Sequence, residues 1–191
     1  VLISGSSGLV GSAALAALRH AGHAVNSLVR PGRPGAPGDV GWDPATGKLE
    51  TAGLEGADAI VHLAGASIAG GRWTAQRRQL LRSSRVEATR SLMSGLAKLR
   101  RPPQVIVAAS AIGFYGDRGD EVLTEQSPPA NDFLAQLARD WETEVARAED
   151  LGMRAVMLRF GVILSPAGGA LQRMLLPFRL GLGGRLGSGE Q

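Results

Sequence analysis

Residues 1–20, VLISGSSGLVGSAALAALRH, join a short apolar run to a glycine-rich turn and a longer helical segment. Val1 to Ile3 are typical of a buried strand, and the glycines that follow indicate a tight turn. Leu9 to Ala21 have the pattern of a helix that Gly22 would end. A strand, a turn and a helix in this order form the frame that a phosphate-binding site needs, so this stretch predicts a nucleotide site.

The glycines of the turn have separate expected roles in dinucleotide binding. Gly5 permits the turn, Gly8 lets the backbone approach a ligand, and Gly11 lets the helix lie close to the strand. Additional hydroxyl donors would come from Ser4, Ser6 and Ser7. The predicted cofactor loop therefore consists of Gly5, Ser6, Ser7, Gly8, Leu9, Val10 and Gly11. No Gly-Lys-Ser or Gly-Lys-Thr follows, which argues against a nucleoside-triphosphate P-loop, and the alternative is a glycine turn that is only structural.

The end of the second expected strand indicates which dinucleotide would bind. NAD sites commonly place an acidic residue there for the ribose 2′-hydroxyl, whereas an arginine accommodates the 2′-phosphate of NADP. This chain has Arg30 at the strand end and Arg33 just beyond it, and no acidic residue lies between Gly22 and Asp39. Because a guanidinium can pair with a phosphate at two points, NADP(H) is the expected cofactor. The alternative is that Arg30 is a solvated loop residue.

Strand and helix patterns alternate along the rest of the chain. Strands are expected at residues 1–3, 23–30, 57–65, 104–109 and 153–164, with a short element at 40–44. Helices are expected at 9–21, 73–99 and 131–152, and residues 168–184 are expected to form a helix that runs into a glycine-rich tail. This alternation predicts an α/β fold with a doubly wound parallel sheet. We expect a Rossmann domain over residues 1–165 and the start of a truncated C-terminal substrate region over 166–191, because LGSGEQ at 186–191 stops without a terminal helix.

Composition narrows the classes of function. The 191 residues contain no cysteine, which leaves neither disulfides nor thiolate metal sites, and we expect no metal. No apolar stretch approaches the roughly 20 residues of a membrane span, so a soluble, cytoplasmic protein without membrane partners is expected. The formal charge of +4 and the pI of about 10.6 come from arginine, since Lys48 and Lys98 are the only lysines. Without a binding motif, this charge does not predict nucleic-acid binding.

Several motifs occur in a fixed order after the opening residues. They are WDP at Trp42–Pro44, VHLAGASIAGGRW at Val61–Trp73, SSRVEATRSL at Ser83–Leu92, SAIGFYGDRGDEVLTE at Ser110–Glu125 and GGALQRMLLPFRLGLGG at Gly168–Gly184. Together they resemble the atypical extended short-chain dehydrogenase/reductases of the NAD-dependent epimerase/dehydratase-like family, over nearly the whole chain. The resemblance implies an extended Rossmann fold that binds NADP(H), with a smaller C-terminal substrate lobe that would lie largely beyond Gln191.

The resemblance also implies site residues. Gly5, Gly8 and Gly11 match the cofactor loop of the family, and Arg30 matches its 2′-phosphate position. The segment His62, Leu63, Ala64 and Gly65 matches the stretch that passes beside the adenine ribose and the pyrophosphate. His62 itself is expected to be a buried strand histidine without a catalytic role.

Three residues are candidates for the substrate cleft. Arg72 and Trp73 lie in the loop beyond the matched segment, and Arg85 lies where many relatives of the wider superfamily have an asparagine. Arg78, Arg82 and Arg85 share one helix face by their spacing. That face is either a solvated basic surface or a contact for an acidic substrate or for the cofactor phosphates.

The chain departs from the superfamily at the catalytic helix. Typical members use a Tyr-x-x-x-Lys pair there, in which the tyrosine transfers a proton and the lysine lowers its pKa. Here the tyrosine position is occupied by Phe133 or Leu134 and the lysine position by Leu137 or Ala138, and none of these can move a proton.

We therefore name Ser110 and the sole tyrosine, Tyr115, as the candidate catalytic residues, and Ser110 also as a cofactor contact. They would orient a carbonyl, with Asp117, Glu142 or Arg72 supplying a charge. The alternative is that residues 113–116 pack the sheet edge while Ser110 donates to the backbone.

Two kinds of function remain open. The first is an NADP(H)-dependent oxidoreductase or epimerase that acts on an unidentified small molecule with non-standard catalytic groups. The second is a regulatory or redox-sensing protein that binds NADP(H) without turning it over, which the missing Tyr/Lys pair favours. A homodimer is expected only by analogy with the superfamily.

Overall fold

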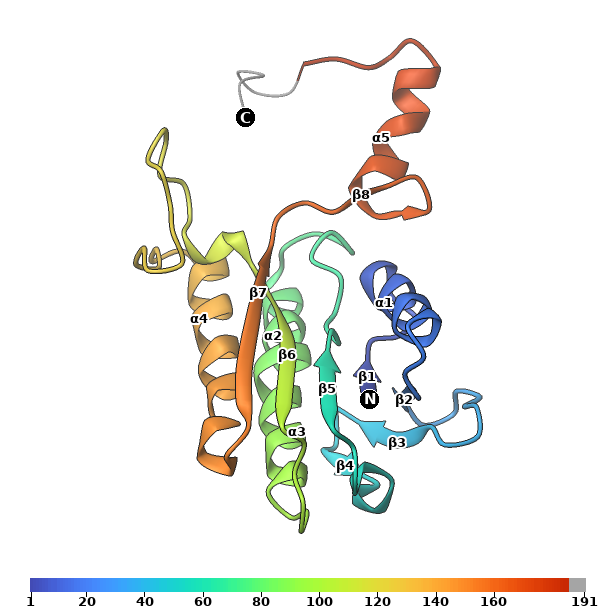
Figure 1. Cartoon of the computed structure of the whole chain (residues 1–191). Coiled ribbons are helices and arrows are strands. Elements are labelled where there is room, and N and C mark those ends of the chain that lie inside the picture. The colour runs from blue at the N-terminus through green and yellow to red at the C-terminus, as the bar shows by residue number, and fades with distance from the viewer. Residues whose placement is uncertain (186–191) are drawn as a thin grey trace. The chain divides into compact units, whose positions relative to one another are not determined.

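The structure is a computed structural model that describes residues 1–185 (Figure 1). It divides into two compact units, Val1–Arg159 and a second unit that begins at Phe160. The LGSGEQ end of the expected substrate region, residues 186–191, lies outside the described residues.

The first unit is built on a seven-stranded sheet. Its strands are β1 (Leu2–Ser4), β2 (Asn26–Val29), β3 (Val40–Asp43), β4 (Lys48–Leu49), β5 (Ala59–His62), β6 (Val105–Ala111) and β7 (Arg154–Phe160), in the spatial order β4-β3-β2-β1-β5-β6-β7. β1 pairs in parallel with both β2 and β5, and β2 with β3 and β5 with β6 are parallel as well. The predicted doubly wound α/β fold is confirmed, whereas the antiparallel edge strand β4 was not predicted.

The helices that connect these strands lie on opposite faces of the sheet. The first unit contains the helices α1 (Leu9–His20), α2 (Ala75–Arg82), α3 (Ala88–Leu96) and α4 (Phe133–Ala146). Short turns of 3₁₀-helix lie at Thr51–Leu54, Ile112–Phe114 and Glu149–Leu151. The chain moves from β1 to β2 in one direction along the sheet and from β5 to β6 in the other. Because such crossovers are right-handed, α1 covers one face and the α2–α3 connection covers the other.

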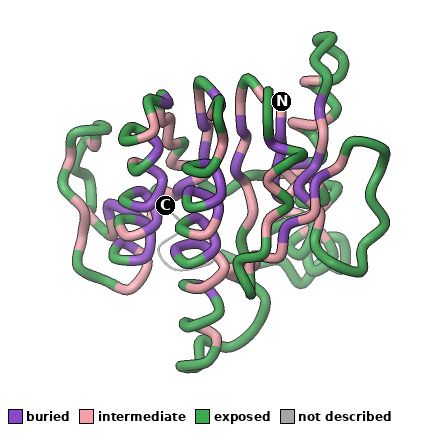
Figure 2. The backbone as a smooth tube through the Cα atoms, turned by 90° about the horizontal axis from the view of Figure 1, so that it is seen from below, coloured by how far each residue is buried: buried purple, intermediate pink, exposed green. Residues whose placement is uncertain are grey.

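The core lies between the sheet and helices α3 and α4. Its fully buried side chains include Ile60 and Ile106 of the sheet and Leu92 and Leu96 of α3. Figure 2 shows the same pattern, with buried positions along the strands and on the inner sides of the helices. This layer positions the carboxyl ends of β1 and β5 side by side, at the point where the strand order reverses, and ligands bind at such points in α/β sheets.

The helix expected over residues 73–99 is continuous but contains one turn of π-helix, Ser83–Glu87, between α2 and α3. The wider turn changes which side chains face the core. Arg85 is buried at 9% exposure, whereas Arg82 stays half-exposed and pairs with Asp140. The expectation of a shared face for Arg78, Arg82 and Arg85 is therefore wrong, because a 3.6-residue period does not hold across a π turn.

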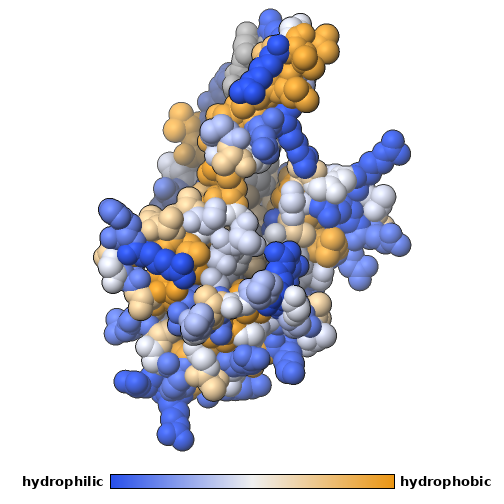
Figure 3. Space-filling view, turned by 90° about the vertical axis from the view of Figure 1, so that its right-hand side faces the viewer, coloured by the Kyte–Doolittle hydropathy of each residue, from blue (hydrophilic) through white to orange (hydrophobic). Residues whose placement is uncertain are grey.

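The second unit contains a short strand and one helix. β8 (Leu164–Ser165) forms bridges to Gly168 and Gly169 at the start of α5 (Gly169–Arg179). α5 ends at Arg179, before the predicted glycine-rich tail. It leaves apolar side chains exposed, among them Leu176 and Phe178, and Figure 3 shows hydrophobic surface of this kind at the top of its view. None of the helices within residues 1–185 is long and apolar enough to cross a membrane.

Candidate functional site

The glycine turn after β1 has the geometry of a phosphate cradle. Gly5 has a φ of +71°, which favours glycine, and its carbonyl oxygen accepts a hydrogen bond from the Gly8 amide at 2.9 Å. A Cβ on Gly11 would lie 2.1 Å from the same carbonyl oxygen, so α1 can approach β1 this closely only with glycine at that position. α1 starts after Gly8 and has no acidic residue in its first turn. Its N-terminal amide groups can therefore receive a diphosphate, so these residues fit a dinucleotide.

The second predicted cofactor segment, Leu63–Gly65, lies against this turn. A Cβ on Gly5 would lie 2.8 Å from the Leu63 carbonyl carbon and oxygen. The Ser4 hydroxyl oxygen accepts from the amides of Leu63 at 3.1 Å and Ala64 at 3.2 Å. Ser4, expected as a cofactor donor, is instead fully buried and occupied by these internal bonds. The structure thus brings the glycine turn and the Leu63–Gly65 segment together at the carboxyl ends of β1 and β5.

His62 is a buried strand histidine, as expected. Its Nδ1 lies 2.7 Å from the Ser4 hydroxyl oxygen and its Nε2 lies 2.9 Å from the Thr89 hydroxyl oxygen, to which the Trp141 indole also donates. Since Ser4 accepts two amide hydrogens, its own hydrogen can go to Nδ1, and Nε2 then donates to Thr89. Burial lowers the pKa of His62 to about 4, so its ring is neutral at pH 7.

A pocket of about 380 Å³ lies beyond the carboxyl end of β2. Arg30 and Arg33 line it, and neither guanidinium has a hydrogen-bond or ion-pair partner among the described residues. Three carboxylates also line it, but internal donors occupy each of them. Asp39 accepts from the Ser27 and Ala36 amides, Asp43 from the Ala45 amide and the Thr46 hydroxyl, and Glu50 from the Gly41 amide. The cations left for a ligand are therefore the two guanidinium groups and the ammonium of Lys48, which also lines the pocket.

The two candidate catalytic side chains are linked through a buried ion pair. The Ser110 hydroxyl donates to Glu142 Oε1 at 2.5 Å. Arg159 donates to both Glu142 oxygens at 2.8 Å and, through Nη1, to the Tyr115 phenol oxygen at 2.7 Å. The alternative in which Ser110 donates to the backbone is therefore wrong. Of the three residues considered as a source of charge, Glu142 makes the contact, because it faces β6 from α4.

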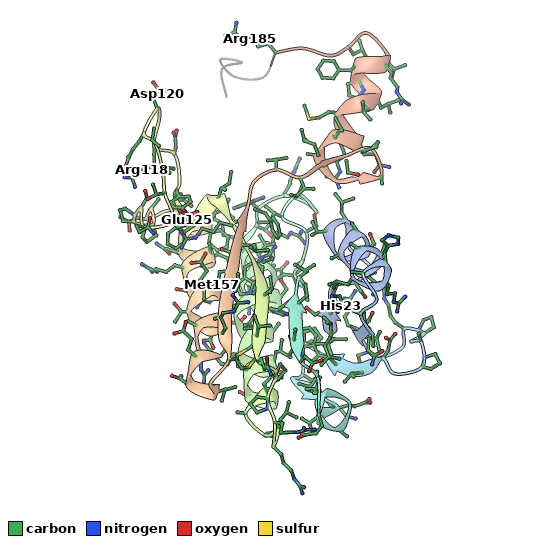
Figure 4. The ribbon with its side chains drawn as sticks, in the orientation of Figure 1. His23, Arg118, Asp120, Glu125, Met157 and Arg185 are labelled. Atoms are coloured by element: carbon green, nitrogen blue, oxygen red, sulfur yellow. The ribbon has the colours of Figure 1, made fainter. Side chains whose placement is uncertain are left out.

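Sequence reasoning missed Arg159, the last residue of the first unit. Its guanidinium carbon lies 3.6 Å from the centroid of the Phe114 ring, and its hydrogen bonds to Glu142 and Tyr115 raise its pKa although burial opposes this. Arg159 also donates to the backbone oxygen of Glu125, which lies with Arg118 and Asp120 in the loop between β6 and α4 (Figure 4). A single arginine inside the apolar run VMLRFGV was the available signal.

Other predicted residues lie apart from this network. Trp73 is 40% exposed and packs edge-on against Phe133, at 5.8 Å between ring centroids. Arg72 is exposed, and the Asp117 carboxylate accepts from the Gly119 amide, so neither contacts Ser110. Leu137 and Ala138, the two alternatives for the lysine position of the missing pair, are both buried.

Arg85 contacts the loop that follows β5. Its guanidinium donates to the backbone oxygen of Ala66 at 3.0 Å, one residue after the Leu63–Gly65 segment. Across residues 1–185, no cluster of three or more histidine, aspartate or glutamate side chains could hold a metal ion.

Comparison with known proteins gives consistent results. The model of the NAD dependent epimerase/dehydratase family matches residues 1–182. The epimerase family protein Mb2239 of Mycobacterium bovis is 44% identical over 191 residues, which are 100% of this chain and 62% of the relative. The chain thus spans about three fifths of the length of this relative.

Two solved structures are similar as well. The human epimerase family protein SDR39U1 (isoform2), crystallised with NADPH, aligns with a TM-score of 0.86 and 36% identity over 100% of this chain and 63% of its own. The nucleoside-diphosphate sugar epimerase from Corynebacterium glutamicum aligns with a TM-score of 0.82 and 40% identity over 98% of this chain and 38% of its own.

Proposed function

Because the chain belongs to the NAD dependent epimerase/dehydratase family, we propose that it is an NADP(H)-binding enzyme that oxidises, reduces or epimerises a small molecule. The observation that carries the cofactor choice is the pocket beside β2, where Arg30 and Arg33 have no partner among the described residues and every lining carboxylate has one. A 2′-phosphate would meet two unpaired guanidinium groups there, whereas a 2′-hydroxyl would meet carboxylates that already accept backbone or side-chain hydrogen bonds. The NADPH in the crystal of human SDR39U1 supports the same choice.

In this proposal the cofactor is held at two places along the carboxyl edge of the sheet. The turn from Gly5 to Gly11 and the Leu63–Gly65 segment receive the diphosphate, and the two arginines receive the 2′-phosphate. When bound, NADP(H) supplies or accepts a hydride. The backbone amides at the start of α1 balance the charge of the diphosphate without a lysine.

Ser110 and Tyr115 would act on the substrate through their hydroxyl groups. The phenol oxygen of Tyr115 accepts from Arg159, so its own hydrogen is available to a substrate oxygen. Arg159 places a positive charge at that oxygen, where typical members of the superfamily use a lysine. Ser110 donates to Glu142 and keeps its lone pairs for a substrate hydroxyl. The pair would thus orient an alcohol or carbonyl and exchange a proton with it.

Titration of the chain with NADPH and NADH, followed by nicotinamide fluorescence, tests the cofactor. We expect NADPH to bind at least about tenfold more tightly than NADH, and Arg30→Asp to remove or reverse this preference. Arg100→Asp is the matched control, since it makes the same charge change in the exposed connection between α3 and β6. Binding of neither dinucleotide would overturn the proposal, and an equal loss of preference in Arg100→Asp would show that only net charge matters.

A non-catalytic NADP(H)-binding protein is the second candidate. It is favoured by the internal partners that already occupy both hydroxyl groups, since Ser110 contacts Glu142 and Tyr115 contacts Arg159. Consumption of NADPH should be measured with aldehydes, ketones and nucleoside-diphosphate sugars, the last because of the name of the relative from Corynebacterium glutamicum. Turnover that Tyr115→Phe abolishes supports the enzyme, whereas tight binding without turnover of any of these classes supports the regulatory protein.

A further inference from the structure

Arg85 is a buried arginine whose charge has no acidic partner. Its guanidinium donates to the backbone oxygens of Ala66 at 3.0 Å and Leu81 at 3.4 Å, and no carboxylate in residues 1–185 pairs with it. Burial and the nearby charge of Arg77 lower its pKa to about 10, so it remains charged at pH 7. Burying a cation without a counter-charge is unfavourable, and here backbone oxygens offset that cost in place of a carboxylate.

The guanidinium lies directly against the cofactor segment. A Cβ on Gly65 would lie 3.1 Å from the Arg85 guanidinium carbon and 3.3 Å from Nη2. The Cα of Gly65 therefore faces the Arg85 guanidinium, and the Ala66 carbonyl oxygen accepts a hydrogen bond from Nη2 of the same guanidinium. Arg77 binds the next residue in a similar way, through the Ser67 backbone oxygen. Two arginines from one helix thus hold the loop that follows β5.

Trp141 connects this contact to the other end of the same segment. The Arg85 guanidinium carbon lies 5.3 Å from the centroid of the Trp141 ring, and the indole donates to Thr89 at 2.9 Å. Thr89 binds His62, which binds Ser4, and Ser4 holds the amides of Leu63 and Ala64. The Trp141 indole therefore supports the Leu63–Ala66 backbone at two places. At the start of this backbone it acts through hydrogen bonds that run over Thr89, His62 and Ser4. At the end it contacts Arg85, which binds the Ala66 carbonyl.

The π turn explains why Arg85 reaches this position. It adds a residue to one turn of the helix and directs Arg85 inward instead of toward solvent. π turns are frequent at functional sites, and this one lies beside the segment that the proposed function assigns to the cofactor.

We infer that Arg85 is a positioning residue for the cofactor, because its guanidinium fixes the Gly65–Ala66 backbone in the shape in which the Leu63–Gly65 segment receives the diphosphate. This inference rests on the proposed cofactor site. In this role Arg85 acts through its hydrogen bond to the Ala66 carbonyl and not by contact with the ligand. A Cβ at position 65 would lie 3.1 Å from the guanidinium carbon, so a side chain there would have to push the guanidinium out of its place against the backbone.

The test is a double-mutant cycle of Arg85→Gln and Gly65→Ala, with Arg82→Gln as the matched control on the exposed side of the same helix. Affinities for NADPH and for 2′-AMP, which lacks the diphosphate, are measured with the melting temperature of each variant. Arg85→Gln should weaken NADPH binding about tenfold, the equivalent of one charged hydrogen bond, and change 2′-AMP binding less than about twofold. Arg82→Gln should change neither.

Gly65→Ala should weaken NADPH binding in the wild-type background but add little to Arg85→Gln, because removing the guanidinium makes room for the new Cβ. Strictly additive effects, or equal losses of NADPH and 2′-AMP binding, would overturn the positioning role. Unchanged NADPH binding by Arg85→Gln would overturn it while the proposed function stands. If the wild-type chain bound no NADPH, the proposed function and this inference would both fail.

Discussion

Arg159 and Glu142 form a two-point ion pair, in which Nε and Nη2 of the arginine each lie 2.8 Å from a different carboxylate oxygen. The pair joins the end of β7 to α4 and holds the Ser110 and Tyr115 hydroxyl groups at its two ends. Both side chains are mostly buried, at 20% and 11% exposure, so water screens the pair only weakly.

Breaking this pair should destabilise the first unit more than removing both charges together. Arg159→Met leaves the Glu142 carboxylate buried with only Ser110 as a partner, and we expect a loss of about 2–4 kcal/mol in the free energy of unfolding. Arg159→Met combined with Glu142→Gln should recover at least about 1 kcal/mol of that loss, because no unpaired charge remains. Urea denaturation of the two single variants and the double variant measures the coupling. A double variant as unstable as the sum of the singles would show that the pair is not coupled.

Gly11 and Gly95 should respond differently to the same substitution. A Cβ on Gly11 in α1 would lie 2.1 Å from the Gly5 backbone oxygen, and one on Gly95 in α3 would lie 2.3 Å from the tip of the Leu49 side chain. Backbone cannot move aside without opening the cofactor turn, whereas a leucine side chain can change rotamer.

We expect Gly11→Ala to destabilise the fold by about 2 kcal/mol or more and to abolish dinucleotide binding. Gly95→Ala should change stability by less than about 1 kcal/mol, since better helix propensity offsets the repacking. Thermal unfolding with and without NADPH compares them, and similar losses in both variants would contradict the distinction between backbone and side-chain obstacles.

His62 should make stability depend on pH. Its folded-state pKa of about 4 lies below the ordinary value of 6.5, so the unfolded chain binds more protons between these values. The contribution of neutral His62 to the free energy of unfolding is therefore fully present above about pH 6.5 and is lost as the pH falls toward 4. Between pH 7.5 and pH 4.5 the loss should be about 2.5 kcal/mol. Urea denaturation at the two pH values measures it, and His62→Gln should remove this part of the pH dependence while leaving that of the carboxylates. An identical pH profile in His62→Gln would contradict the assignment.

Asp132 should be the N-cap of α4. Its carboxylate accepts from the Leu134 amide at 2.8 Å and the Ala135 amide at 3.0 Å, whereas the neighbouring Asn131 contributes only its backbone oxygen, to the Gln136 side chain. Asp132→Ala should cost about 1 kcal/mol of unfolding free energy, and Asn131→Ala should be close to neutral. Thermal denaturation separates the two, and the reverse order would assign the cap to Asn131.

Most of the fold could be predicted because it depends on local patterns. Apolar runs of strand length and the glycine turn before Leu9 each act within a few residues, and the strands and helices they predict are present. The element ends were less accurate, and the expected strand over residues 23–30 is limited to Asn26–Val29. β4 was missed because a two-residue strand forms only when the turn after Asp43 returns it to β3.

The arrangement of the candidate site was only partly open to sequence reasoning. The glycine turn could be named because glycine has few reasons to occur twice in a strand-to-helix turn, whereas the Leu63–Gly65 segment was predicted only from the family resemblance. The partners of Ser110 and Tyr115 could not be assigned from spacing, since Glu142 lies 32 residues from Ser110 and Arg159 lies 44 residues from Tyr115.

The sequence by itself thus determined the order of strands and helices, the glycine turn and the arginines after β2, because these depend on short-range backbone preferences and on residue type. Only the tertiary structure decided that Arg85 turns inward beneath Gly65 and that Arg159 joins Tyr115 to Glu142. Those contacts require a π turn and the packing of α4 on β6 and β7. Their energies arise between groups far apart in the chain, so no local pattern of residues encodes them.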